Sequence, residues 1–251
     1  MSQLQQDLTG KVVAVTGASR GLGRAFAHAL AREGTQVVLM ARASEALDKV
    51  AGELPDAMAQ PCDVSSPDSV RAAFAVIGAR YGRLDSLVNN AALLRPVPFE
   101  KISDEHLLRE IHTNFLGPAL TIREAIPLLR AAGGGDIVNI SSDSMTVQSP
   151  HLTFYAATKG GLEQLSIGLR QELRPDKIRV TVLRSGPVAD SELHRGWAME
   201  DREAFYAAME ASGALARFGA PVRPEVMAET LVHLLRMPAE AAVDHLTMRP
   251  L

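Results

Sequence analysis

The chain has 251 residues, enough for one sizeable hydrophobic core, and its 47% hydrophobic and 22% charged residues are typical of a globular protein. Its net charge of -3 supplies no basic surface for nucleic acid or for an anionic membrane. We therefore expect neither a nucleic-acid partner nor a membrane partner.

The first residues, MSQLQQDLTG, contain neither the basic nor the apolar segment of a secretory signal peptide, and no uncharged apolar run is long enough to span a membrane. The single cysteine, Cys62, cannot form an internal disulfide, which is typical of a reducing compartment. Since Cys62 has no clear partner base, we interpret it as a packing residue and not as a catalytic thiol. These features predict a cytoplasmic protein whose residues 1–251 form a single domain.

Strand-like and helix-like segments alternate along the chain. Short apolar runs predict strands at residues 12–16, 36–41, 57–61, 84–89, 136–141, 178–183 and 242–248. Apolar residues at helical spacing predict helices after the first glycines and after possible N-caps at Ser44, Ser66 and Ser103. Two further helices are predicted, one at about residues 155–173 and one that begins at Pro224. This alternation predicts one α/β domain, a Rossmann-type doubly wound parallel sheet of about seven strands with helices on both faces.

Residues 187–222 interrupt the alternation with short helical pieces, which indicates a mobile lid over a site. Mostly apolar side chains gather in this segment and in the loops after the fourth and fifth strands. They are Leu93, Leu94, Ser144, Met145, Val147, Phe154, Trp197, Met199, Phe205, Tyr206 and Met209. They either line a roomy apolar substrate pocket or pack the lid onto the core, and the pattern does not separate these alternatives.

The first strand runs directly into TGASRGLG, residues 16–23. Gly17, Gly21 and Gly23 permit a tight turn and let a pyrophosphate approach the backbone, while the start of the next helix offers free N–H groups. A glycine turn without a ligand is the alternative. The position of the turn between the first strand and the first helix favours a dinucleotide site.

Residues 155–159 read YAATK, so that Tyr155 and Lys159 lie one helical turn apart. A nearby ammonium favours the phenolate and lowers the pKa of a tyrosine. The pair is therefore a candidate acid/base group, and a solvated helix face is the alternative. His112, His151 and His194 lack the spacing of metal ligands, so we expect no metal site.

Five motifs in order resemble the short-chain dehydrogenase/reductase family in its classical branch. TGASRGLG resembles the family's TGxxxGxG, and NNAA at residues 89–92 resembles NNAG. Asn114 stands where the family has a helix asparagine, IVNISS ends at Ser142, and YAATK matches YxxxK. The match extends from about residue 8 to the last strand. It implies a dinucleotide-dependent oxidoreductase.

The resemblance implies four catalytic residues. Tyr155 is the general acid/base, and Lys159 stabilises its phenolate and binds the nicotinamide ribose. Ser142 hydrogen-bonds the substrate oxygen, and Asn114 orders a water in a proton relay. Each residue alone also has an ordinary structural role. The occurrence of all four in order behind a dinucleotide turn favours catalysis.

The residues after the second strand favour NADP(H), although NAD(H) stays possible. The acid that binds the ribose of NAD is replaced by Ala41, while Arg42 and Arg20 suit a 2′-phosphate. Two solvated surface arginines are the alternative. The resemblance implies these cofactor-binding residues: Gly17, Ser19, Arg20, Gly21, Leu22, Gly23, Arg42, Asp63, Val64, Asn90, Ala91, Ala92, Tyr155, Lys159, Gly186 and Val188.

Two functions are compatible with the sequence. The first is an NADP(H)-dependent carbonyl reductase or alcohol dehydrogenase for a fairly apolar substrate. The second is a non-catalytic nucleotide-binding sensor or interaction module. The intact Ser142, Tyr155 and Lys159 favour the enzyme; Asp190, which replaces the threonine of the family's PGxxxT and can repel a diphosphate, favours the sensor. The resemblance also implies a homo-oligomer, a tetramer or dimer, with helices near 101–118 and 155–173 as its faces.

Overall fold

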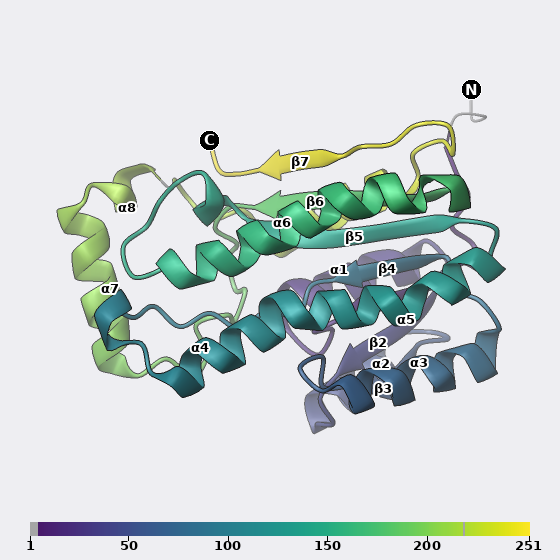
Figure 1. Cartoon of the computed structure of the whole chain (residues 1–251), viewed down its shortest axis with the longest axis horizontal. Coiled ribbons are helices and arrows are strands. Elements are labelled where there is room, and N and C mark those ends of the chain that lie inside the picture. The colour runs from purple at the N-terminus through teal and green to yellow at the C-terminus, as the bar shows by residue number, and fades with distance from the viewer. Residues whose placement is uncertain (1–4, 218) are drawn as a thin grey trace.

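The computed structural model describes residues 5–217 and 219–251. Within them seven parallel strands form one sheet in the order β3-β2-β1-β4-β5-β6-β7 (Figure 1). The strands are β1 (Val12–Thr16), β2 (Gln36–Ala41), β3 (Met58–Pro61), β4 (Ser86–Asn89), β5 (Gly135–Ser142), β6 (Ile178–Ser185) and β7 (His245–Met248). The order reverses between β1 and β4, and the carboxyl ends of strands at such a reversal flank a ligand-binding crevice. The predicted sheet is confirmed.

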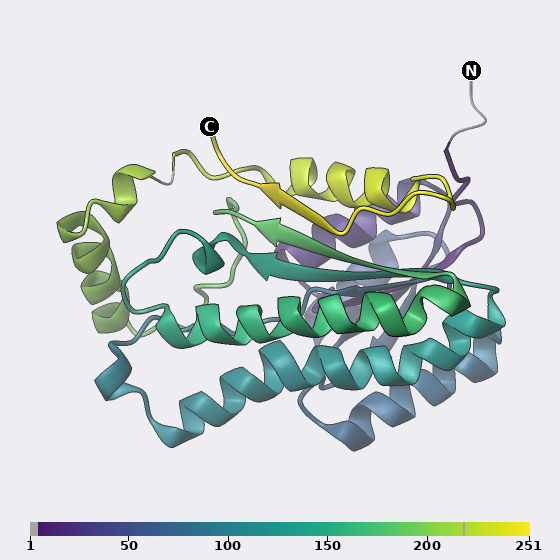
Figure 2. The ribbon, with the colours of Figure 1, turned by 45° about the horizontal axis from the view of Figure 1, so that its top comes forward.

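Helices cover both faces of this sheet (Figure 2). One face packs against α1 (Gly21–Arg32), α2 (Glu45–Glu53) and α9 (Pro224–Leu235), and the other against α3 (Pro67–Tyr81), α5 (Gly117–Ala131) and α6 (Thr153–Leu173). Strand β1 shows why: Val13 and Val15 pack with the first group, Val12 and Ala14 with the second. Both faces are apolar, so the strand reads as a continuous apolar run.

The three predicted N-caps are confirmed. The hydroxyl of Ser44 accepts from the N–H of Leu47, and that of Ser66 accepts from the N–H of Ser69. Ser103 caps α4 (Asp104–Ile111) by accepting from the N–H of His106. These hydroxyls bind N–H groups that the helices cannot satisfy internally, which is why the starts of these helices are readable from sequence.

The structure differs from the prediction after Ser103. Helix α4 continues through the π-helical η2 (His112–Leu116), both within the predicted helix near 101–118, and then into α5, which extends beyond that prediction to Ala131. Helical spacing after Ser103 predicts an apolar face that includes Leu108 and Ile111, yet these two side chains are exposed. The buried side chains of α4 and η2 are His106, Glu110 and Asn114. Apolar spacing failed here because the buried groups are polar: His106 and Glu110 pair with each other, and Asn114 hydrogen-bonds Leu93 and Thr158.

The segment predicted as a lid forms a closed loop, described apart from residue 218. It contains α7 (Met199–Ala211) and α8 (Ala214–Arg217) and lies beyond the carboxyl ends of β5 and β6 (Figure 1). Its two ends are tied together, because Val222 donates to the carbonyl of Pro187 and accepts from the N–H of Ala189, both at 2.9 Å. Short 3-10 turns complete the fold: η1 (Phe99–Lys101), η3 (Asp143–Met145) and η4 (Arg174–Asp176).

Adjacent residues of α3 test whether this packing stabilises the fold. Ile77 is completely buried between α3 and the sheet, whereas Val76 is 46% exposed. We expect Ile77→Ala to lower the free energy of unfolding by about 2–5 kcal/mol, because it leaves a cavity in the core. Val76→Ala should lower it by about 0.5 kcal/mol or less. Urea unfolding of both variants measures the difference, and equal losses would contradict the packing described.

Candidate active site

The glycine turn after β1 packs directly against the end of β4. A Cβ added to Gly17 would lie 2.9 Å from Cα of Ala91, and one added to Gly23 would lie 2.6 Å from Nδ2 of Asn90. The hydroxyl of Thr16 accepts from the N–H groups of Asn90 and Ala91, each at 3.0 Å, and Asn90 Nδ2 donates to the carbonyl of Thr16 at 2.9 Å. The two predicted motifs therefore form one packed unit that requires glycine.

The first turn of α1 is the candidate site for a diphosphate. Arg20 at the N-cap makes no side-chain capping hydrogen bond, and the first turn contains no acidic residue. The N–H groups of Gly21, Leu22 and Gly23 have no intrahelical acceptor, and the helix dipole favours an anion beside them. Ser19 is half-buried in the same turn. The residues present therefore fit the diphosphate of a dinucleotide.

The ends of β2 and β3 lie beside this turn. The N–H of Ala18 donates to the carbonyl of Met40 at 3.3 Å, which brings the glycine turn to the residues before Arg42. The guanidinium groups of Arg20 and Arg42 are on exposed residues at this edge. Two cations at one edge of the crevice suit an anionic group such as a phosphate.

Asp63 and Val64 follow β3 at the same edge. The hydroxyl of Ser65 donates to the Asp63 carboxylate at 2.6 Å, and the N–H of Ser65 donates to it at 3.0 Å. These hydrogen bonds, with a smaller contribution from the charge of Arg42, hold the pKa of Asp63 below its usual value. Val64 is buried, and a Cβ on Gly117 would lie 3.1 Å from its side chain. Asp63 thus keeps a fixed, ionised carboxylate beside the crevice.

The four predicted catalytic residues come from three elements that meet at the ends of β4 and β5. Tyr155 and Lys159 of α6 are 6% and 2% exposed, and Lys159 Nζ lies 5.8 Å from the centre of the Tyr155 ring. Nζ donates to the carbonyl of Ile140 at 2.8 Å. Ser142, the last residue of β5, hydrogen-bonds Tyr155. The structure therefore brings the serine, the tyrosine and the lysine together.

Asn114 holds η2 against this group. It is completely buried, and its side-chain amide exchanges two hydrogen bonds with the backbone of Leu93, each 2.7 Å long. Its Nδ2 also lies 3.3 Å from the hydroxyl of Thr158, the residue before Lys159. Its position beside α6 is compatible with the predicted relay.

Burial is the largest influence on the pKa values of Tyr155 and Lys159. It raises the pKa of the Tyr155 phenol well above its usual value, against the opposing hydrogen bond from Ser142. It lowers the pKa of Lys159 to about 8, against the opposing charges of Glu110 and Glu163. We expected a lowered pKa for Tyr155; in the polypeptide itself desolvation raises it instead, and the charge of Glu110 adds to the rise. Tyr155 therefore needs a further positive charge nearby before it can ionise near neutral pH.

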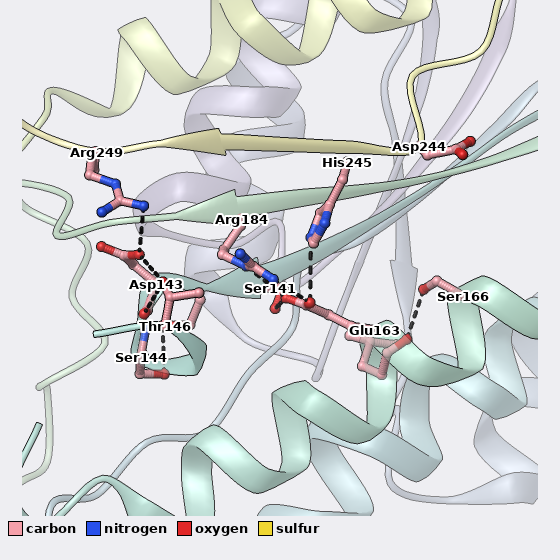
Figure 3. Close-up of polar contacts among 12 residues, drawn as sticks. Ser141, Asp143, Ser144, Thr146, Glu163, Ser166, Arg184, Asp244, His245 and Arg249 are labelled. Carbon is pink, nitrogen blue, oxygen red and sulfur yellow. Dashed lines mark hydrogen bonds and ion pairs between the residues drawn. The ribbon is translucent and has the colours of Figure 1, made fainter. Parts of the chain in front are cut away.

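A polar network that was not predicted from the sequence surrounds the carboxylate of Glu163 (Figure 3). Ser141 donates to Oε1 of Glu163 at 2.5 Å, and Arg184 donates to both carboxylate oxygens, at 3.0 and 2.6 Å. His245 of β7 lies 3.4 Å from the same carboxylate. The network joins β5, β6, β7 and α6 where Ser142 is held. The only sequence signal was the position of Glu163 one turn after Lys159.

A second missed carboxyl lies on α4. Glu110 is 1% exposed, and its Oε2 lies 2.8 Å from Nε2 of His106. Burial raises the pKa of Glu110 to about 8, and the charge of Lys159 opposes the rise. The spacing of His106, Glu110 and Asn114, four residues apart each time, was the signal available in the sequence.

Gly186 and Val188 lie at the neck of the lid. The N–H of Gly186 donates to the carbonyl of Met248 at 2.8 Å, and a Cβ on Gly186 would lie 3.0 Å from Cα of Arg249. Val188 forms a β-bridge with Val222. The close approach of the C-terminal residues therefore accounts for glycine at position 186, and a cofactor contact of either residue stays a prediction.

Asp190 lies beside the glycine turn. It is exposed and has a φ of 49°, and the next carbonyl, that of Ser191, would lie 2.2 Å from a Cβ on Gly21. A side chain at position 21 would therefore clash with the neck of the lid as well as strain the backbone. The lid begins at the very turn that we expect to bind the diphosphate.

The lid covers an apolar cluster at Tyr155. Leu94, Leu152 and Tyr155 are buried together, and Leu193, Trp197 and Phe205 of the lid pack against them. The indole N–H of Trp197 donates to the carbonyl of Leu94 at 2.7 Å. Two of the residues considered for a substrate pocket, Met199 and Tyr206, are instead 75% and 46% exposed on α7. They lie outside the cluster because α7 turns only one side toward the site.

Two further findings concern residues 5–217 and 219–251. No helix in them is both long and apolar enough to cross a membrane. No three His, Cys, Asp or Glu side chains in them gather as a metal site requires. His112, His151 and His194 thus belong to no such cluster in the part of the chain that the structure describes.

Comparison with known proteins places the chain in a family. Residues 11–201 match the sequence model of the short chain dehydrogenase family. An uncharacterized oxidoreductase of Methylorubrum extorquens is 38% identical over 192 residues, 74% of this chain and 77% of that protein. The 3-oxoacyl-[acyl-carrier-protein] reductase of Homo sapiens is 37% identical over 177 residues, 70% of this chain and 75% of that protein. The chain belongs to the short-chain dehydrogenase/reductase family of oxidoreductases.

The fold is shared over almost the whole chain. A metagenomic short-chain oxidoreductase, solved in complex with NADP, is similar with a TM-score of 0.80 at 28% identity, over 98% of this chain and 99% of that one.

Two glycine variants test the packed turn. In Gly23→Ala the new Cβ would lie 2.2 Å from the carbonyl oxygen of Gly17, so the turn must open. In Gly52→Ala on α2 nothing lies within 4 Å. We expect the first change to weaken NADPH binding by about tenfold or more, about 1.4 kcal/mol. The second should leave binding unchanged and stabilise the helix by up to about 1 kcal/mol.

Fluorescence titration with NADPH measures both affinities, and thermal unfolding shows whether each variant is folded. Equal affinities in two folded variants would mean that the turn does not hold the cofactor.

Proposed function

We propose that this protein is an NADP(H)-dependent oxidoreductase that interconverts carbonyl compounds and secondary alcohols. One observation carries the proposal: Tyr155 and Lys159 are buried on one face of α6, with Ser142 hydrogen-bonded to the tyrosine at the same edge of the sheet as the glycine turn. A proton donor for a carbonyl oxygen thus faces the crevice in which a dinucleotide would bind. The reductase named among the relatives supports this reading.

The mechanism follows from the positions of these side chains. A bound nicotinamide would supply the hydride for reduction and, in its oxidised form, a positive charge that favours the phenolate. Tyr155 donates its proton to the carbonyl oxygen, and Ser142 donates a hydrogen bond to the same oxygen as negative charge develops there. The ammonium of Lys159, held by the carbonyl of Ile140, stabilises the phenolate that remains. Alcohol oxidation reverses the proton transfer.

Charge at the crevice edge supports a preference for NADP(H). Arg20 and Arg42 are both exposed beside the turn, and position 41 holds alanine where an acid would repel a 2′-phosphate. A similar structure contains NADP, and so does serine dehydrogenase, which has a TM-score of 0.84 and 27% identity with this chain. NAD(H) is the alternative cofactor, because NAD(H) and NADP(H) share the diphosphate that the residues of the glycine turn would bind.

The lid supports a fairly apolar substrate. Tyr155 forms a buried cluster with Leu94 and Leu152, and Leu193, Trp197 and Phe205 pack against this cluster. Apolar walls around one proton donor suit a carbonyl group attached to a hydrocarbon body.

We also propose that the protein is a homo-oligomer, a dimer or tetramer. Leu108 and Ile111 of α4 and Ile167 of α6 expose 56%, 37% and 48% of their surfaces. These helices lie on the same side of the sheet (Figure 2). A second copy would remove these apolar side chains from water.

Replacing Tyr155 tests the chemistry. We expect Tyr155→Phe to lower kcat for ketone reduction by about 10²–10⁴-fold, because the general acid is lost. Binding of NADPH should be retained. Tyr206→Phe is the matched control, since Tyr206 is 46% exposed on α7, and it should keep full activity.

NADPH consumption is measured across a panel of ketones for the wild type and both variants. If the wild type binds NADPH tightly yet reduces nothing in the panel, the enzyme proposal fails for these substrates and the sensor hypothesis becomes the better explanation.

Replacing Arg42 tests the cofactor preference. A charge-assisted hydrogen bond contributes about 1.5–3 kcal/mol, so Arg42→Ala should raise the KM for NADPH about tenfold or more. The KM for NADH should not change. Arg32→Ala, at the far end of α1 where Arg32 pairs with Glu229, is the control and should alter neither value. Parallel changes for NADPH and NADH would refute a role of Arg42 at the 2′-phosphate.

A further inference from the structure

A row of buried polar side chains leads from the active site along α4. His106, Glu110 and Asn114 are spaced by four residues, lie on one helical face and are 8%, 1% and 0% exposed. The last of them contacts Thr158 of α6, which lies between Tyr155 and Lys159 in the sequence. Apolar residues would be expected on a helix face packed against another helix. The row therefore requires an explanation beyond packing.

Glu110 is the unusual member of the row. Its Oε2 lies 2.8 Å from Nε2 of His106, while its Oε1 is buried with no hydrogen-bond partner among the described residues. A buried carboxylate with one neutral partner is costly, so the protonated form is favoured. Burial raises the pKa of Glu110 to about 8 and lowers that of His106. The carboxyl can therefore gain and lose its proton near neutral pH.

Charged groups on several elements act on the pair. Lys159 and Tyr155 of α6 interact electrostatically with Glu110. Arg95, Arg109 and Asp201 act on His106, from the loop after β4, from α4 and from α7. Since Arg95 and Asp201 also pair with each other at 2.7 Å, their opposite effects on His106 partly cancel. The main charged partner of Glu110 is thus Lys159.

We propose that Glu110, held in place by His106, is a positioning residue that controls the charge state of the Tyr155–Lys159 pair. The inference rests on the proposed function of that pair. When Glu110 loses its proton, its negative charge favours the ammonium of Lys159 and disfavours the phenolate of Tyr155. Reduction needs a protonated tyrosine, so the ionised Glu110 extends carbonyl reduction toward higher pH. Only a proton is exchanged with solvent in this step.

The pH profile of kcat/KM for ketone reduction tests the proposal in Glu110→Gln, which keeps the shape of the side chain. Without the negative charge the pKa of Tyr155 falls, so the decline of activity at high pH should shift down by about 0.5–1 pH unit. Glu105→Gln is the control: Glu105 lies on the same helix with a side chain that is 79% exposed, and the profile should not move. A uniform loss of rate, or an unshifted decline, would overturn the proposal.

A second measurement does not require activity. Carbon-13 NMR of carboxyl-labelled glutamate, assigned by the signal missing in Glu110→Gln, should show that Glu110 titrates near pH 8. In Lys159→Met the pH at which Glu110 is half-titrated should rise, because the ammonium of Lys159 lowers the pKa of Glu110. An ordinary midpoint, or one indifferent to Lys159, would overturn the proposal even if the protein reduces ketones. If it reduces none, the proposed function fails while the coupling of Glu110 to Lys159 is still decided by this titration.

Discussion

The parallel pairing of β1 with β4 is the constraint on which the rest of the structure depends. Val13, Ala14 and Val15 pair with residues 86–88 in register, so that the glycine turn and Asn90 leave the sheet side by side. Because every strand is parallel, the loops after β2, β3, β5 and β6 reach the same edge. The hydroxyl of Thr16 then locks the two central loops together. A crevice with free N–H groups on one side and a proton donor on the other follows from this one arrangement.

Buried polar contacts hold the helices of the active site in place. Asn89 of β4 donates to Asn139 of β5 at 2.9 Å, Thr121 of α5 donates to Asn89 at 2.7 Å, and Asn139 donates to Ser166 of α6 at 2.9 Å. These bonds are directional, unlike the apolar contacts around them, so they set the rotation of α5 and α6 about their axes. The rotation of α6 in turn directs Tyr155 and Lys159 toward the end of β5.

Desolvation governs the chemistry that such a site can perform. Tyr155 and Lys159 are removed from water, and burial drives the pKa of the first up and that of the second down. Both groups are therefore biased toward neutrality, and charges brought into the site decide when they ionise. Glu110 and Glu163 are such charges within the chain, and a cofactor adds another. Residues of the segment after β6 pack over Tyr155, and Trp197 fixes that segment by donating to the carbonyl of Leu94.

The sequence by itself determined the alternation of strands and helices, the three serine caps and the order of the motifs, because these depend on local spacing and local hydrogen bonds. It also identified Ser142, Tyr155 and Lys159 as a group. Only the tertiary structure decided which face of α4 and η2 is buried, since Asn114 is held there by Leu93 and Thr158, which are distant in sequence. It also decided the direction of the pKa shift at Tyr155, because desolvation depends on how many side chains from other elements surround a group, and no local pattern records that.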